Sequence, residues 1–176
     1  MQILIIVVAM LATMALAGGM MYLLVKRYFD NEQKERLLQM KIDERRETLK
    51  VVTPIRLQAY ERMALFLERI SPDSLVLRCY QPGMDLKLLQ GVMTKNIRDE
   101  WEHNLSQQVY LDSATWARIR EAKDEMVNLV NSSAVTLTDT DDPTRLAATI
   151  FASAAKHLPT DKALEELHKE INELFG

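Results

Sequence analysis

The sequence predicts an all-α protein, in which an N-terminal transmembrane helix continues into a charged stalk and then into a compact bundle of about five helices. Three observations support this prediction. The first 25 residues carry no charged side chain, although the 176-residue chain holds 22 Lys and Arg and 25 Asp and Glu. In the remainder, apolar residues recur every three or four positions, as on one face of a helix. No segment alternates apolar and polar residues for long enough to indicate a strand.

Composition narrows the class of protein further. The net charge of −3 argues against nucleic acid as a partner, because such binding depends mainly on neutralising phosphates. A single Cys excludes a disulfide framework and a multi-cysteine zinc site. About 150 residues follow the uncharged leader, which is enough for one hydrophobic core. We therefore expect three parts: an anchor at 1–25, a stalk at 26–52 and a helical domain at 53–176.

The leader is predicted to be a retained transmembrane anchor. As a helix, residues 3–25 would be about 35 Å long, enough to cross a hydrocarbon core of about 30 Å. The alternative is a cleaved signal peptide, because Ala15-Leu16-Ala17 resembles a cleavage site. Against it, no basic residue precedes the apolar run, and the run continues well past Ala17. The anchor would make membrane lipid one partner of the chain.

Basic residues on one side of the leader predict its orientation. Only the α-amino group precedes the apolar run, whereas Lys26, Arg27 and five further basic residues follow within about twenty positions. The positive-inside rule then places a short N-terminus outside and the helical domain in the cytoplasm.

The stalk is predicted to be a charged helix with a thin apolar stripe. Residues 26–50 hold eight basic and six acidic side chains, with Leu38 and Ile42 among the apolar residues between them. Such a stripe suits pairing with another helix, although a solvated spacer or contact with anionic lipid would have the same composition. In the anchor, Ala9, Thr13 and Ala17 recur every four residues, a spacing that permits close helix approach. These residues therefore predict helix pairing, either with a second copy of the chain in a homo-oligomer or with a helix of another protein.

Capping and turn residues divide the domain into helices. Thr53-Pro54 predicts a helix start, and the apolar run after it predicts a central helix that ends at Ser71-Pro72. Residues 75–80 are expected to form a short helix. Asp85, Asp112 and Asp142 each precede a predicted helix as its cap, the first helix reaching about Tyr110, and residues 138–142 are predicted to form a polar loop. A last helix follows Pro159-Thr160, with an apolar stripe of Leu164, Leu167, Ile171, Leu174 and Phe175. The least exposed side chains should include Met63, Phe66, Leu67, Trp101, Trp116 and Ile119.

Two Glu-x-x-His spacings are the strongest candidates for chemistry. Glu100/His103 and Glu165/His168 match the motif that di-iron bundles place on two of their helices. Metal ligands must converge inside the bundle, but the helical periodicity points these side chains away from the apolar stripes. We therefore predict no metal, no cofactor and no catalytic residue, and an interaction protein in place of an enzyme.

Two amides stand out on the long helix that follows Asp85. Asn104 and Gln108 fall at the centre of its apolar stripe, where a buried amide needs a partner. The helix end could leave the core at this point, or the amides could form a buried network or face a partner.

Three segments carry a family resemblance: residues 55–70, the turn Gln81-Pro82-Gly83-Met84, and residues 97–110. Together they resemble an uncharacterised bacterial family of small single-span membrane proteins with a helical cytoplasmic region. The resemblance covers roughly residues 50–130 and implies a location in the bacterial inner membrane, without an activity or a cofactor. We expect a membrane-tethered adaptor or an accessory subunit of an envelope complex. A helical-bundle enzyme or metal protein, or a sensor of anionic lipid, remains the alternative.

Overall fold

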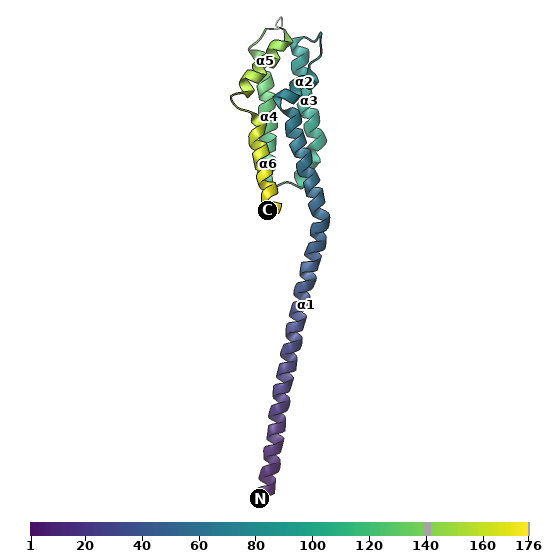
Figure 1. Ribbon diagram of the computed structural model, residues 1–176, viewed down its shortest axis with the longest axis vertical. Helices are drawn as coiled ribbons and strands as arrows, with labels where there is room; N and C mark the ends of the chain where they lie inside the picture. Colours follow the sequence, from purple (N-terminus) through teal and green to yellow (C-terminus); the bar gives the residue numbers. More distant parts are fainter. Residues whose placement is uncertain (139–141, 176) are drawn as a thin grey trace. The chain divides into compact units, whose positions relative to one another are not determined.

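The computed structural model describes residues 1–138 and 142–175, without the side chains at 4, 8, 9, 12 and 175. This part of the chain is helical and contains no strand, so the predicted all-α class is confirmed. The helices are α1 (Gln2–Ile70), α2 (Pro72–Cys79), α3 (Leu86–Asn104), the 3₁₀ helix η1 (Leu105–Val109), α4 (Ser113–Val135), α5 (Pro143–Ala154) and α6 (Pro159–Phe175) (Figure 1). The chain divides into two compact units, Met1–Val52 and Thr53–Gly176.

The first unit consists of a single stretch of helix. Its large apolar side chains are exposed, including Leu16 at 75% and Leu38 at 59% of their full accessible area. Among the residues that the structure describes, none of the helices is both long enough and apolar enough for a membrane span. The assignment of residues 1–25 as an anchor stays a prediction.

Helix α1 does not break at Pro54, and the predicted helix start at Thr53-Pro54 is therefore wrong. A proline inside a helix lacks the N–H that would bond to the carbonyl four residues earlier, here that of Lys50. The ring also fixes φ near −65°, a value that a helix accepts. The residues on both sides include good helix formers such as Leu49 and Leu57, and they continue the helix across the missing bond.

The other helix boundaries follow the capping signals. The carboxylate of Asp85 accepts the N–H of Leu88, and that of Asp142 accepts the N–H and the hydroxyl of Thr144. These two bonds lower the pKa of Asp142. The carboxylate of Asp112 precedes α4 and accepts the N–H of Ser113, the first residue of that helix. The predicted loop at 138–142 falls largely on residues 139–141, which lie outside the described part of the chain.

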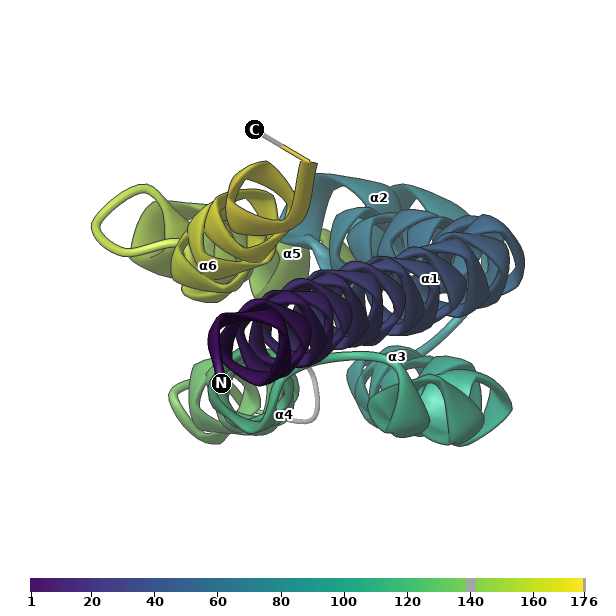
Figure 2. The same ribbon diagram turned by 90° about the horizontal axis from the view of Figure 1, so that it is seen from below.

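The second unit has one hydrophobic core. Helix α4 packs against α3, α5 and α6, and α2 packs against α3 and α5 (Figure 2). Among the described residues, fully buried side chains come from every α-helix of this unit, and the largest are Tyr60, Met63, Phe66, Leu67, Ile70, Leu75, Leu89, Met93, Ile97, Ile119, Met126 and Leu146. The prediction that residues 54–70 form a central helix is therefore confirmed by Met63, Phe66 and Leu67.

The two tryptophans are only partly buried, which corrects the prediction that they are among the least exposed residues. Trp101 and Trp116 stack on each other with ring centroids 4.6 Å apart, and Phe66 packs against Trp101 at 5.7 Å. The Nζ atom of Lys123 lies 5.3 Å from the Trp101 ring centroid, within cation–π range. The stack thus closes the edge of the core between α3 and α4.

The buried face of α6 differs from the predicted stripe. The buried positions are Pro159, Thr160, Ala163, Leu167 and Glu170, whereas Leu164 and Ile171 are partly buried and Leu174 is 43% exposed. Small residues at 160 and 163 allow this close packing, and α4 is the helix against which α6 packs most extensively. The face is therefore rotated by about one residue toward Glu170, a polar side chain that hydrophobic periodicity does not identify as buried.

Candidate functional site

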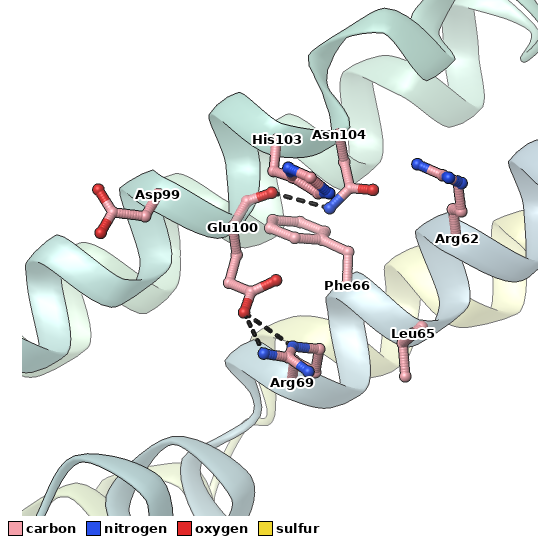
Figure 3. Close-up of a pocket in the computed structure, with 8 residues that line it drawn as sticks. All are labelled: Arg62, Leu65, Phe66, Arg69, Asp99, Glu100, His103 and Asn104. Atoms are coloured by element: carbon pink, nitrogen blue, oxygen red, sulfur yellow. Dashed lines mark hydrogen bonds and ion pairs between the residues drawn. The ribbon is translucent and has the colours of Figure 1, made fainter.

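An open groove between α1 and α3 contains the first predicted Glu-x-x-His pair (Figure 3). Its volume is about 580 Å³. The lining residues are Arg62, Leu65, Phe66 and Arg69 of α1 with Asp99, Glu100, His103 and Asn104 of α3. Phe66 lies beneath the groove and is only 1% exposed, whereas Leu65 at its edge is 58% exposed, so the groove offers charged groups beside one apolar side chain.

Glu100 is neutralised by two arginines. Its Oε1 atom accepts the Nε of Arg69 at 2.8 Å and the Nη2 of Arg69 at 2.5 Å, and it lies 3.4 Å from the Nη1 of Arg78. Arg78 also donates to the carbonyl of Arg69 at 2.7 Å. A carboxylate held by two guanidinium groups is a poor metal ligand, because the positive charges compete with a cation. Glu100 instead ties the end of α1 to α3.

The second Glu-x-x-His pair lies on α6, away from the first pair in the chain. His103, Glu165 and His168 are exposed, so three of the four residues do not face the bundle interior. Within the described residues, no group of three or more His, Cys, Asp and Glu side chains could hold a metal ion.

The two candidate amides have different environments. Asn104 is buried, and its side-chain amide donates to the carbonyl of Glu100 at 2.8 Å, whereas Gln108 is exposed. The cause is the change from α3 to η1, because a 3₁₀ helix advances about 120° per residue in place of about 100°. In an unbroken α-helix Gln108 would lie on the apolar stripe, but in η1 its side chain lies off that stripe.

Arg62 is the binding group that the groove leaves available. Within the described residues its guanidinium has no ion pair, and it lies on the α1 wall at the end of the groove where α3 carries the amide of Asn104 (Figure 3). The lining contains no Ser or Cys, so the groups on offer are the Arg62 guanidinium, the His103 imidazole, the exposed Leu65 side chain and the Asp99 carboxylate, which pairs with Lys95. Such a lining can bind an anionic or mixed polar and apolar surface.

A buried carboxylate that the sequence reasoning missed lies on α6. Oε1 of Glu170 accepts the hydroxyl of Tyr60 at 2.8 Å, the N–H of Asp112 at 2.9 Å and the Nη2 of Arg56 at 3.2 Å. Arg56 also donates its Nε to the carbonyl of Tyr110 at 3.1 Å. We call this set the Glu170 clasp. Its donors come from α1 and from the connection between η1 and α4, so only the tertiary fold reveals it.

The clasp is enclosed within the second unit. Tyr60 is 1% exposed and Glu170 is 8% exposed, and the Oε2 atom of Glu170 is buried without a partner among the described residues. Burial, together with the hydrogen bond to Glu170 and its negative charge, raises the pKa of Tyr60 to about 12. Tyr60 therefore remains a neutral hydrogen-bond donor across the physiological pH range.

Cys79 is a buried thiol in α2. Burial raises its pKa, and the nearby charge of Arg78 opposes this only in part. A thiol with a raised pKa is rarely in the reactive thiolate form.

The interaction candidates of the first unit lie on exposed helix. Thr13, Ala17, Leu38 and Ile42 are exposed, and the hydroxyl of Thr13 donates to the carbonyl of Met10 at 2.9 Å. The side chain of Ala9 lies outside the described part of the chain. A role of these residues in pairing stays a prediction.

The fold and groove together define the class: an all-α protein whose second unit is a helical bundle with a charged groove between α1 and α3. The chain belongs to a family of unknown function, DUF7935, whose sequence model matches residues 1–174. Comparison with curated proteins and with solved structures found no match. The expectation of an uncharacterised family is confirmed, and the single-span part of the resemblance stays a prediction.

Proposed function

We propose that this chain is a membrane-tethered interaction protein, held in a bacterial inner membrane by residues 1–25 and presenting its helical domain in the cytoplasm. The observation that carries the proposal is the charge distribution of the sequence. No charged side chain occurs before Lys26, whereas residues 26–50 contain eight basic and six acidic ones. A helix with this leader gains free energy by placing residues 3–25 in hydrocarbon and its basic flank at the cytoplasmic surface.

The second unit supports the interaction part of the proposal. It has its own buried core, and its groove offers an available guanidinium at Arg62 beside the exposed apolar side chain of Leu65. Exposed apolar side chains on the stalk, such as Leu38 and Leu49, add a second surface that a partner helix can cover. An adaptor or an accessory subunit of an envelope complex needs both features, a tether and free surfaces.

Alkaline-carbonate extraction of membranes tests the tether. The full chain is expected to stay in the membrane pellet. A variant with Leu16→Arg and Met20→Arg should move to the supernatant, because each arginine at the centre of a spanning helix costs about 2.5–3.5 kcal/mol. The matched control carries the same change and spacing in the stalk, Leu38→Arg and Ile42→Arg, and should stay in the pellet. Release of the unaltered chain, or equal behaviour of the two variants, would contradict the tether.

Native electrophoresis after mild detergent tests the adaptor role. A chain of 20.2 kDa that acts in a complex should migrate well above the position of one chain with bound detergent. Migration as a single chain in every mild detergent would contradict the role in a stable complex.

A further inference from the structure

One row of side chains follows the stalk at a regular spacing. Counted along the sequence, the row alternates steps of three and four residues, the heptad pattern of helices that pack side by side. We call it the stalk seam, which consists of Tyr28, Asn31, Glu35, Leu38, Ile42, Arg45, Leu49 and Val52. A helix start at Pro54, as predicted from the sequence, would have separated this row from the domain. The unbroken helix α1 removes that interruption.

The same count leads into the core of the second unit. After Arg56 it reaches Ala59, Met63, Phe66 and Ile70, which are all between 0% and 1% exposed. These residues are covered by the other helices of the bundle. The stalk seam has the same pattern, but among the described residues no other helix covers it. Leu38 is 59% exposed and Leu49 is 55% exposed.

Two charged residues interrupt the seam and restrict its partner. Glu35 and Arg45 occupy seam positions, and neither forms an ion pair within the described residues, whereas the neighbouring Glu32 pairs with Arg36 at 2.5 Å. A side chain at a seam position faces the partner helix directly. The partner must therefore offer a positive charge to Glu35 and a negative charge to Arg45.

A second copy of this chain does not meet that requirement. This step rests on the proposed function, because two chains anchored in one membrane leave it in the same direction. Paired in register, they would place Glu35 against Glu35 and Arg45 against Arg45, and Lys41 would face Arg46 on the flank. An antiparallel copy would match Glu35 with Arg45, and a common membrane excludes that orientation.

We propose that the stalk seam binds a parallel helix of a different protein. That helix presents apolar side chains to Leu38, Ile42, Leu49 and Val52, a basic side chain to Glu35 and an acidic side chain to Arg45. The contact covers about 36 Å of helix at about 1.5 Å per residue, a length sufficient for more than three heptads. The stalk is then the specific binding element of the adaptor.

A charge-swapped copy of the chain itself serves as the probe. Glu35→Arg with Arg45→Glu gives a parallel helix that has the required charges and the same apolar residues. Wild-type and swapped full chains with different tags, all with Val52→Cys in a Cys79→Ser background, are co-expressed and oxidised in membranes. Mixed pairs should form about ten times more cross-link than wild-type pairs or swapped pairs, because two attractive contacts replace two repulsive ones on each pairing.

The control moves the same exchange of charge off the seam. Asp43→Lys with Lys50→Glu changes one acidic and one basic side chain at positions that do not face the partner, and mixing this variant with wild type should give no gain. Equal cross-linking of wild-type and mixed pairs would overturn the proposal in favour of a second copy. The absence of cross-links in every mixture would overturn it as well.

The same membranes separate this inference from the tether. If carbonate releases the chain, the proposed function fails and the inference fails with it. If the chain stays in the membrane and the cross-links ignore the charges at 35 and 45, only the inference fails.

Discussion

At the scale of single residues, Glu170 joins three distant parts of the second unit through one carboxylate oxygen. Its Oε1 atom accepts donors from Tyr60, Arg56 and Asp112, which belong to parts of the chain more than fifty residues away. Sequence patterns could not have revealed this, because a Glu in a charged helix is normally exposed and its partners are remote. Asn104 was found by its place on the apolar stripe, since that signal is local.

Replacing Glu170 by Ala should lower the free energy of unfolding by about 3 kcal/mol, because it leaves buried donors without an acceptor. Urea titration of the purified full chain, followed by the fluorescence of Trp101 and Trp116, measures the change. Glu166→Ala on the same helix is the control, since Glu166 makes only a surface pair with Lys169 and should cost less than about 1 kcal/mol. Equal effects of the two substitutions would contradict the clasp.

Tyr60 predicts how the stability of the second unit depends on alkaline pH. Its pKa is about 12 in the folded chain and near 10 in an unfolded one. A raised pKa stabilises the fold below pH 10, and this contribution disappears as the pH rises from 10 toward 12. Wild type should lose up to about 2 kcal/mol more than Tyr60→Phe over that interval in urea titrations. Parallel curves for the two proteins would mean that Tyr60 titrates normally.

At the scale of helices, local signals located most boundaries. Asp85, Asp112 and Asp142 cap the helices that they were expected to begin, because a cap depends on a bond within a few residues. The prediction failed at Pro54, where continuation of the helix outweighs one lost hydrogen bond. It failed again at Gln108, where the change to a 3₁₀ helix shifts the phase of the side chains.

Substitutions at Thr53 and Pro54 test the continuity of α1. In the interior of a helix, Pro54→Ala should raise the free energy of unfolding by about 1–3 kcal/mol, and Thr53→Ala should raise it by a few tenths. If a helix began at Thr53, the first change would be nearly neutral and the second would cost about 1 kcal/mol through the lost cap. Urea titration of both variants distinguishes the two cases.

At the scale of the whole molecule, the proposed function requires a membrane tether joined to a helical domain. The all-α class was predictable from periodicity because each helix must bury one apolar face. The buried face of α6 was not predictable from periodicity, because the packing of small residues against α4 sets the rotation of this helix. The charge distribution along the chain remains the main guide to its place in the cell.

Thiol labelling of intact cells tests this central claim most directly. In a Cys79→Ser background, single cysteines are placed at Gln2, before the apolar run, and at the exposed Ser132 of α4. A membrane-impermeant maleimide should label Gln2→Cys from outside and should label Ser132→Cys only after the membrane is permeabilised. Labelling of Ser132→Cys in intact cells, or protection of both cysteines until permeabilisation, would contradict a single span with the helical domain in the cytoplasm.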